Sequence, residues 1–155
     1  MYLDLEGISL ATVLNCRVPE DRYYWVDKHV WAREFGGLVE VGITDAAQTL
    51  AGKFLVCRIK KPGRELKKGG SGATLESGKW VGAVSTPVSG VIKEVNPEAE
   101  KTPILLNQDP YGTWLFRLEP TQWDLEKSDL LIGATAVQAY KAKIEADGIA
   151  CQEKT

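Results

Sequence analysis

The segment Glu76-Ser77-Gly78-Lys79 places a lysine between two strand-like runs, in the pattern of a tight β-hairpin. Gly78 lacks a Cβ, so it can adopt the positive φ that short hairpin turns often require. Lys79 is therefore expected at the hairpin tip, exposed and accessible to a modifying enzyme. Covalent modification of its amine is the chemistry that such a position allows. Taken alone, the segment is more typical of an unmodified, solvated lysine on a turn.

The cysteines suggest no comparable chemistry. Cys16, Cys57 and Cys151 are widely spaced, and the chain has no CxxC pair, so neither a zinc site nor a thioredoxin-like pair is indicated. Cys57 lies in an apolar run and is expected in the core. Cys16 and Cys151 lie near the ends of the chain, and either could be a free thiol. A redox role for any of the three is the less favoured interpretation.

Composition limits the class of protein. The chain has 155 residues, of which 44% are hydrophobic and 26% charged, as in an ordinary globular domain. A net charge of −2 gives no electrostatic footprint for nucleic acid or an anionic membrane. No apolar run reaches the length of a membrane span, and the start of the chain lacks the features of a signal peptide. We therefore expect a cytoplasmic protein with no nucleic-acid or membrane partner.

The lysine hairpin must be positioned by a mainly β domain, because glycine punctuates short β-branched runs throughout the middle of the chain. We expect a short helix that begins at a Thr44 or Asp45 cap, continues through Leu50 and ends at Gly52. From about Leu125 the apolar spacing indicates one or two helices. The expected strands are residues 38–43, 53–59, 73–77, 80–85, 91–95 and 114–118.

We expect one domain over residues 1–155, because no flexible linker divides the chain. Within it, residues 1–22 are expected to form an N-terminal arm or short helix. Residues 23–120 are expected to form the β core, and residues 121–155 the C-terminal helical segment.

The order of the motifs resembles the glycine-cleavage H-protein family, whose members are lipoyl carriers. Each motif alone is weak, but six in the same order over roughly residues 23 to 145 make a specific pattern. The matching segments are His29-Val30-Trp31, the run from Val41 to Gln48 with Leu50 and Gly52, Pro62-Gly63, Glu76 to Lys79, Pro87 to Gly90 with Val95-Asn96, and Leu106 to Leu115.

The resemblance implies a flattened β-barrel or barrel-sandwich hybrid of the lipoyl-carrier type with a C-terminal helix. It also implies that lipoic acid is joined to Lys79 by an amide bond. A lipoate ligase or lipoyl transferase would read Glu76, Ser77 and Gly78 around that lysine. The resemblance further implies a carrier that acts with partner enzymes and catalyses no reaction itself. No metal site is expected.

Two more residues are candidate contacts of the lipoyl arm. His29 is the chain's only histidine, and an imidazole that titrates near neutrality can tune a thiol. Its alternative role is structural, as a hydrogen-bonded residue beside Trp31. Trp80 follows the lysine directly and offers the arm an apolar surface. Ordinary packing between the sheets is equally consistent with its position.

The chain departs from the H-protein pattern where that family holds an aminomethyl group. The family has an acidic residue directly after the histidine and another four positions after the lipoyl lysine. This chain has Val30 and Ala83 there, with Lys28 before the histidine. A cationic amine would lose its carboxylate partners, and burial of an unpaired charge is costly. An uncharged or anionic cargo therefore suits these residues better.

The departure favours a specialised relative, the lipoate-binding protein of the heterodisulfide-reductase-like sulfur-oxidation system. The expected function is to shuttle a sulfur-bound intermediate on the Lys79 arm to a heterodisulfide-reductase-like complex. Dihydrolipoamide dehydrogenase is a further expected partner. One alternative is a glycine-cleavage H-protein that carries the aminomethyl group with the glycine-cleavage enzymes. Another is an unmodified scaffold or binding module. The sequence leaves open the cargo, the docking surface, the oligomeric state and the source of the lipoyl group.

Overall fold

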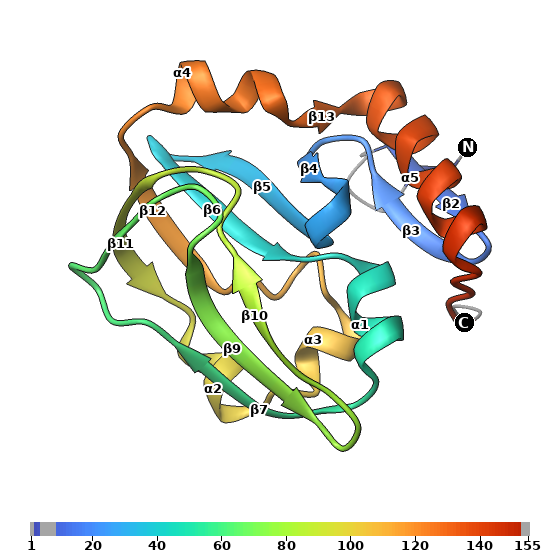
Figure 1. Ribbon diagram of the computed structural model, residues 1–155, viewed down its shortest axis with the longest axis horizontal. Helices are drawn as coiled ribbons and strands as arrows, with labels where there is room; N and C mark the ends of the chain where they lie inside the picture. The colour runs from blue at the N-terminus through green and yellow to red at the C-terminus, as the bar shows by residue number, and fades with distance from the viewer. Residues whose placement is uncertain (1, 4–8, 153–155) are drawn as a thin grey trace.

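The computed structural model describes residues 2–3 and 9–152, whose strands form three antiparallel sheets (Figure 1). The largest sheet has seven strands, in the order β13 (Leu131–Ile132), β4 (Tyr23–Trp25), β5 (Val30–Phe35), β6 (Leu38–Ile43), β12 (Phe116–Pro120), β11 (Gly90–Val95) and β8 (Glu65–Leu66). The second has three, in the order β10 (Val81–Ser85), β9 (Ser71–Ser77) and β7 (Phe54–Ile59). The third also has three, in the order β1 (Tyr2–Leu3), β2 (Ser9–Val13) and β3 (Cys16–Pro19).

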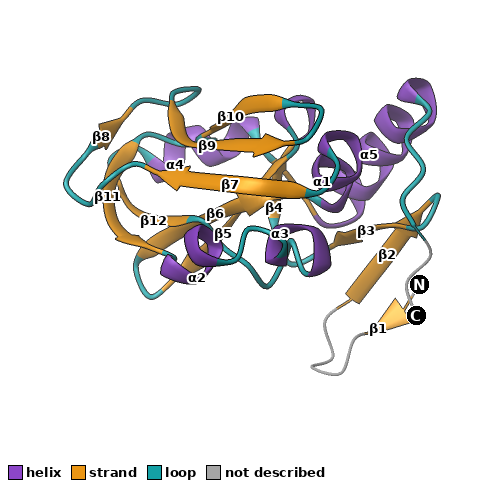
Figure 2. Cartoon of the chain, turned by 90° about the horizontal axis from the view of Figure 1, so that it is seen from below, coloured by secondary structure: helices purple, strands orange, loops and turns teal. Residues whose placement is uncertain are grey.

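The β7–β9–β10 sheet lies over the seven-stranded sheet, as Figure 2 shows from the side. The main core lies between the two sheets, because alternate side chains of each point toward the other. Leu75 from β9 and Phe116 from β12 are both buried there. Gly72 allows this close approach, since a Cβ at that position would overlap the Phe116 ring. The mainly β fold expected from the sequence is confirmed.

Five α-helices are present in the described part of the chain: α1 (Asp45–Ala51), α2 (Pro97–Lys101), α3 (Leu105–Gln108), α4 (Trp123–Glu126) and α5 (Gly133–Asp147). Two short 3₁₀ helices, η1 (Val26–Lys28) and η2 (Lys127–Asp129), connect other elements. A second core lies beneath α5, where Tyr140 and Ile144 pack with Tyr24 and Trp31. Gly42 accommodates the Trp31 ring, which a Cβ there would overlap.

Several local predictions agree with the structure. Strand β6 covers the expected residues 38–43. Helix α1 begins at an N-cap Thr44, whose hydroxyl accepts a hydrogen bond from the amide of Ala47 at 3.2 Å. It ends at Gly52, which has a φ of 85°. The expected C-terminal helix is α5.

Other segments differ from the expectation. Residues 9–13 and 16–19 form strands where we expected an arm or short helix, since Leu14 and Asn15 turn the chain back on itself with positive φ. Leu131 lies in β13, not in a helix, because it pairs with Tyr24 at the edge of the large sheet. The expected strand 114–118 is shifted to β12. Asn96, expected only to end a strand, also caps α2 by accepting a hydrogen bond from Glu98 N at 3.1 Å.

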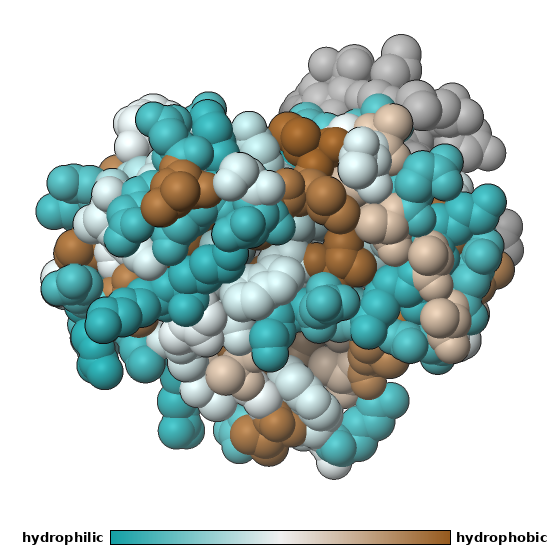
Figure 3. Space-filling view, turned by 45° about the horizontal axis from the view of Figure 1, so that its top comes forward, coloured by the Kyte–Doolittle hydropathy of each residue, from teal (hydrophilic) through white to brown (hydrophobic). Residues whose placement is uncertain are grey.

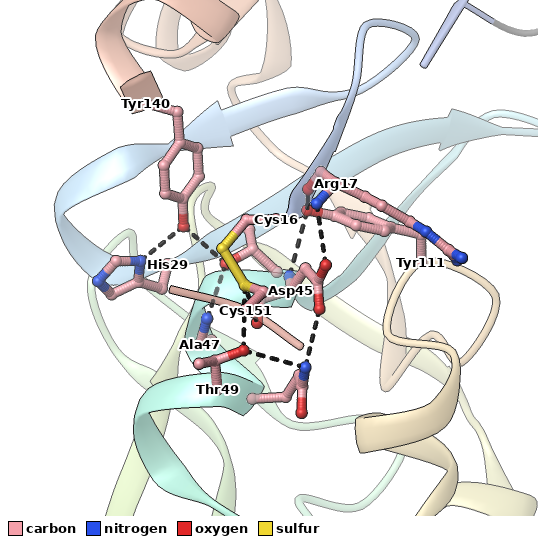
Figure 4. The surroundings of a disulfide bond; sticks show 11 residues. Cys16, Arg17, His29, Asp45, Ala47, Thr49, Tyr111, Tyr140 and Cys151 are labelled. Carbon is pink, nitrogen blue, oxygen red and sulfur yellow. Dashed lines mark hydrogen bonds between the residues drawn. A yellow bond between two sulfur atoms is a disulfide. The ribbon is translucent and has the colours of Figure 1, made fainter. Parts of the chain in front are cut away.

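The expectation that Cys16 or Cys151 is a free thiol is wrong, because the two form a disulfide with a Cα–Cα distance of 5.0 Å (Figure 4). The β2–β3 hairpin returns the N-terminal segment to the C-terminal tail, where Cys151 N donates to Leu14 O at 3.1 Å. This pairing was not visible in the sequence because 135 residues separate the cysteines. Cys57 is buried as expected, and burial raises its thiol pKa to about 12.

The face that carries α4, β13 and α5 is mixed in polarity. Figure 3 shows a group of apolar residues near the upper centre of the view, between mostly polar regions. Leu125 of α4 and Ile132 of β13 are exposed there, at 68% and 43%. Among the described residues, no helix combines the length and apolar character needed to cross a membrane.

Candidate functional site

Lys79 lies at the exposed tip of the hairpin between β9 and β10. The strands pair from Glu76 opposite Val81 onward, and Ser77 N donates to Trp80 O at 2.8 Å to close the turn. Gly78 does not have the positive φ expected of it. The turn instead uses the Ser77 hydroxyl, which accepts a hydrogen bond from Lys79 N at 3.3 Å, as serine side chains commonly do in turns.

Ser77 also fixes the hairpin tip to α1. Its hydroxyl donates to the carbonyl oxygen of Ala51 at 2.6 Å. That carbonyl belongs to the last turn of α1, where helix carbonyls have no partner within the helix. The bond therefore stabilises the end of α1 and holds the lysine-bearing turn beside it.

A cavity of about 370 Å³ lies next to this hairpin. Its lining comes from η1 and the start of β5, from β6, from α1 and from the β7, β9 and β10 strands. The lining residues are Lys28, His29, Val30, Ile43, Ala47, Leu50, Ala51, Phe54, Leu75, Trp80, Ala83 and Val84. Most are apolar, and Lys28 and His29 supply the polar side chains.

The structure thus brings together residues that the sequence separated widely. Lys28, His29, Val30, Trp80 and Ala83 all line the same cavity. Within this lining, formed by described residues, neither position that the H-protein pattern makes acidic provides a carboxylate.

Glu76 lies outside the cavity lining, half-buried on β9 between Val56 and Val81 of the neighbouring strands. Sequence reasoning missed Leu50 and Phe54 as cavity residues. For Leu50 the sequence gives a partial signal, because an apolar residue lies there at the end of a short predicted helix. In the structure this residue is 48% exposed. Phe54 gives none, because its pattern is that of an ordinary core strand.

Trp80 forms one wall of the cavity. Its ring folds back over Gly82, where a Cβ would overlap it, and meets the Phe54 ring edge-on at a centroid distance of 6.5 Å. The side chain is 40% exposed, so it is neither a core residue nor free in solvent. The ring is thus an apolar part of the cavity lining, and its contact with an arm on Lys79 stays a prediction.

His29 lies at the polar end of the cavity and belongs to a hydrogen-bonded chain. Its Nδ1 is 2.6 Å from the Tyr140 hydroxyl, which is 2.6 Å from the Thr44 hydroxyl (Figure 4). Burial lowers the His29 pKa, and the nearby Lys143 lowers it further. The imidazole is therefore neutral near pH 7. A neutral ring that accepts from Tyr140 at Nδ1 carries its proton on Nε2.

Lys28 and His29 are the polar residues of the cavity lining, and Lys28 Nζ lies 6.0 Å from the centroid of the Trp25 ring. The Lys28 ammonium has three donor hydrogens and no acceptor. The His29 ring donates through Nε2 when its Nδ1 accepts from Tyr140. A cation close to Lys28 would meet a like charge, whereas an anion would be attracted. Among the described residues, no group of three or more His, Cys, Asp and Glu side chains could hold a metal ion.

Comparison with known proteins identifies relatives of the whole fold. The family model "Glycine cleavage H-protein" matches residues 22–144. A probable glycine cleavage system H protein 2 of Saccharolobus solfataricus is 46% identical over 142 residues, which cover 89% of this chain and 95% of that protein. A glycine cleavage system H protein 2 of Aquifex aeolicus is 41% identical, covering 90% and 88%.

A solved structure of a protein with the same family name is also similar to this chain. The crystal structure of a glycine cleavage system H protein from Mycobacterium marinum superposes with a TM-score of 0.67 at 30% identity. The match covers 85% of this chain and all of that chain.

Proposed function

We propose, since this chain belongs to the glycine cleavage H-protein family of non-catalytic lipoyl carriers, that Lys79 carries lipoic acid through an amide bond. The observation that supports this most directly is the exposed tip position of Lys79 beside an apolar cavity. Amide formation removes the ammonium charge and extends a flexible stem. The dithiolane at its end then reaches partner sites at high effective concentration.

Recognition by the lipoylating enzyme is assigned to the hairpin itself. Glu76, Ser77 and Gly78 lead directly into the lysine, and Ser77 holds the turn in one conformation. A lipoate ligase or lipoyl transferase reads this turn and acylates Lys79. Dihydrolipoamide dehydrogenase is a further partner, because the arm cycles between dithiol and disulfide.

The cargo that best fits the cavity is bound through sulfur. Val30 and Ala83 present alkyl groups to the cavity, and Lys28 is an exposed lysine of the lining, with its Nζ 6.0 Å from the centroid of the Trp25 ring. A persulfide or sulfur oxyanion on the arm is anionic, so it gains from Lys28, whereas a protonated amine is repelled. The dihydrolipoyl arm holds sulfane sulfur on a thiol and delivers it to a heterodisulfide-reductase-like complex, which oxidises it and takes up the electrons.

A cytoplasmic location is part of this proposal. Disulfides are uncommon in reducing compartments, because thiol reductants attack their sulfur atoms. The Cys16–Cys151 pair is protected from such attack, since Cys16 is 0% and Cys151 5% exposed.

Carriage of an aminomethyl group is the second candidate function. The names of the relatives from Saccharolobus solfataricus and Aquifex aeolicus favour it, because both are called glycine cleavage system H proteins. The cavity lining weighs against it for the reasons of charge given above.

Intact-protein mass spectrometry after incubation with lipoate ligase and lipoate tests the carrier function. We expect one lipoyl mass on the protein and none on Lys79→Arg, while Lys53→Arg, an exposed control, remains modifiable. Absence of the added mass on the unaltered protein would contradict the proposal. The lipoylated protein should then be offered to glycine decarboxylase with glycine. Slow turnover supports a sulfur cargo, and efficient turnover would establish the aminomethyl carrier instead.

A further inference from the structure

Residues 58–68, which run from the end of β7 through β8, concentrate positive charge in a chain that is otherwise acidic. The segment holds six of the 19 lysine and arginine residues and one of the 21 acidic residues. Its net charge is therefore +5, and the rest of the chain carries −7, since the whole chain has a net charge of −2. Such a separation of charge within one small domain creates a local potential that attracts an anionic partner.

Five of these six cations form no ion pair with a described residue. Lys68 is the exception, because its Nζ lies 3.0 Å from Asp129 Oδ2. The other five, which we call the basic patch, are Arg58, Lys60, Lys61, Arg64 and Lys67. All of them are exposed except Lys60, which is half-buried. Their charges therefore remain available to a partner.

Backbone hydrogen bonds hold the loop that carries the basic patch. Lys60 N donates to Gly72 O at 2.9 Å, which fixes the start of the loop to β9. Gly63 N donates to Ile92 O at 2.7 Å, and the amide of Ile92 donates in turn to Arg64 O at 2.9 Å. The turn is thus joined to β11, with which β8 pairs directly afterwards. A partner meets cations whose backbone is already ordered, and this reduces the entropy lost on docking.

The basic patch lies at the end of the β7–β9–β10 sheet opposite to Lys79. Lys60 is bonded to Gly72 near the start of β9. Lys79 follows Ser77, where the same strand ends, and Ser77 is bonded to α1. Figure 2 shows β8 and α1 at opposite ends of this sheet. Because β9 has seven residues, the two sites are about 20 Å apart along the sheet. A protein bound at the basic patch therefore leaves the lysine turn uncovered.

On the premise that Lys79 is lipoylated and acts with partner enzymes as proposed above, we propose that the basic patch docks an acidic surface of the enzyme that receives the cargo. Opposite charges steer the two proteins together and fix their orientation. Docking away from Lys79 lets the arm enter the partner's site while the two proteins stay bound, which keeps its effective concentration high. A nucleic acid fits less well, because the net −7 of the rest of the chain repels a long polyanion.

The test measures binding of the lipoylated protein to an immobilised heterodisulfide-reductase-like complex by surface plasmon resonance. The patch variant combines Lys61→Glu with Arg64→Glu, two exposed positions of the basic patch. The matched control combines Lys53→Glu with Lys141→Glu, since both lysines are exposed, lie outside the patch and form no ion pair among the described residues. Both double variants lower the net charge equally, so a difference between them measures position. Urea unfolding checks that each remains folded.

We expect the dissociation constant to be about tenfold higher for the patch variant than for the control, mainly through slower association. The difference should shrink at about 1 M salt, where the Debye length is only about 3 Å. A carbodiimide, which joins amines to carboxylates, gives a second readout on the unaltered protein. Its cross-links to the complex are expected at Lys60, Lys61 and Lys67 and not at Lys53 or Lys141. This readout decides the question if the patch variant does not fold.

The outcomes separate the docking surface from the proposed function. If the unaltered protein accepts no lipoyl group, or does not bind the complex once lipoylated, the proposed function fails and the docking surface fails with it. If it binds and the two double variants bind equally well, the docking surface alone is overturned. Cross-links at Lys53 and Lys141 in place of the patch would also overturn it. Transfer RNA is the probe for the other class of partner. A mobility shift that the patch variant abolishes, with binding to the complex unchanged, would assign the patch to nucleic acid instead.

Discussion

Cys16 and Cys151 form a disulfide that joins the β2–β3 hairpin to the C-terminal tail across 135 residues of sequence. The bond is packed against α1, where the Thr49 hydroxyl donates to Cys151 Sγ at 3.1 Å. The same helix lines the cavity with Ala47, Leu50 and Ala51. The covalent link therefore supports a helix that lines the cavity.

Loss of this disulfide is expected to destabilise the protein. Replacement of both cysteines, Cys16→Ala with Cys151→Ala, should lower the free energy of unfolding by about 2–4 kcal/mol, since a cross-link over a long loop restricts the unfolded chain. Urea unfolding with and without reductant measures this. The free energy of unfolding of the double variant should not change when reductant is added. That of the unaltered protein should fall toward the value of the double variant. An unaltered protein whose stability does not change once mass spectrometry shows the bond reduced would contradict the prediction.

His29 is expected to make stability depend on pH. Its folded pKa lies below the unfolded value of about 6.5, so near and below that pH the unfolded chain binds more protons. The free energy of unfolding should therefore fall as the pH is lowered through this range. His29→Asn removes the titrating ring, and asparagine tolerates the φ of 57° at this position.

Urea unfolding at about pH 7.5 and about pH 5.5 gives, for each of the two proteins, the change in the free energy of unfolding between these pH values. The unaltered protein should lose more stability than His29→Asn over this interval. The groups that face the ring from neighbouring elements, Lys143, Asp147 and Asp27, are present in both proteins and cancel in the comparison. Equal losses would show that His29 does not titrate in this range.

The parts of the fold that could be predicted are those set by local chemistry. Thr44 and Gly52 delimit α1 because a hydroxyl cap and a glycine terminator act within one turn of the chain. The β9–β10 hairpin follows from alternating residues on either side of a short turn. In contrast, the conformation of the turn could not be predicted. Positive φ was expected at Gly78, but the turn is held by Ser77, whose hydroxyl donates to Ala51 O on α1, 26 residues away in the sequence.

The parts that could not be predicted depend on contacts between distant segments. The disulfide requires both ends of the chain to meet beside α1. The cavity exists only where η1, α1 and the lysine hairpin come together, so its individual residues, Leu50 among them, could not be grouped beforehand. Val30 and Ala83 could be identified only because the family pattern marks their positions.

The buried Glu40 is expected to be a major contributor to stability. It is 1% exposed and pairs with Arg33 at 2.7 Å and with Arg117 at 2.9 Å. Glu40→Gln would leave two guanidinium groups without their buried partner and should cost about 3 kcal/mol. Glu94→Gln is the matched control, since Glu94 also pairs with Arg117, at 3.1 Å, but is 48% exposed. That change should cost about 0–1 kcal/mol, as measured by urea unfolding. Equal costs would mean that burial does not distinguish the two pairs.

Lys28 is expected to retain an anionic cargo on the arm. The reduced, lipoylated protein is loaded with sulfane sulfur from polysulfide, and the release of thiocyanate on addition of cyanide gives the rate of loss. Lys28→Gln removes the cationic residue of the cavity lining. An exposed charge contributes up to ~1 kcal/mol, so loss should be accelerated by up to about fivefold. The effect should weaken at high salt, because counterions screen an exposed charge.

The matched control is Lys53→Gln, because Lys53 is an exposed lysine next to Gly52 that does not line the cavity. Both variants lower the net charge equally, so a difference between them measures position and not overall charge. Ala83→Asp tests the same charge effect by adding a negative charge in place of removing a positive one. It returns a carboxylate to the cavity lining and should also accelerate loss of an anion. If Lys28→Gln and Lys53→Gln lose the sulfur at the same rate, Lys28 does not act on the cargo, and the charge argument for a sulfur anion loses its main residue.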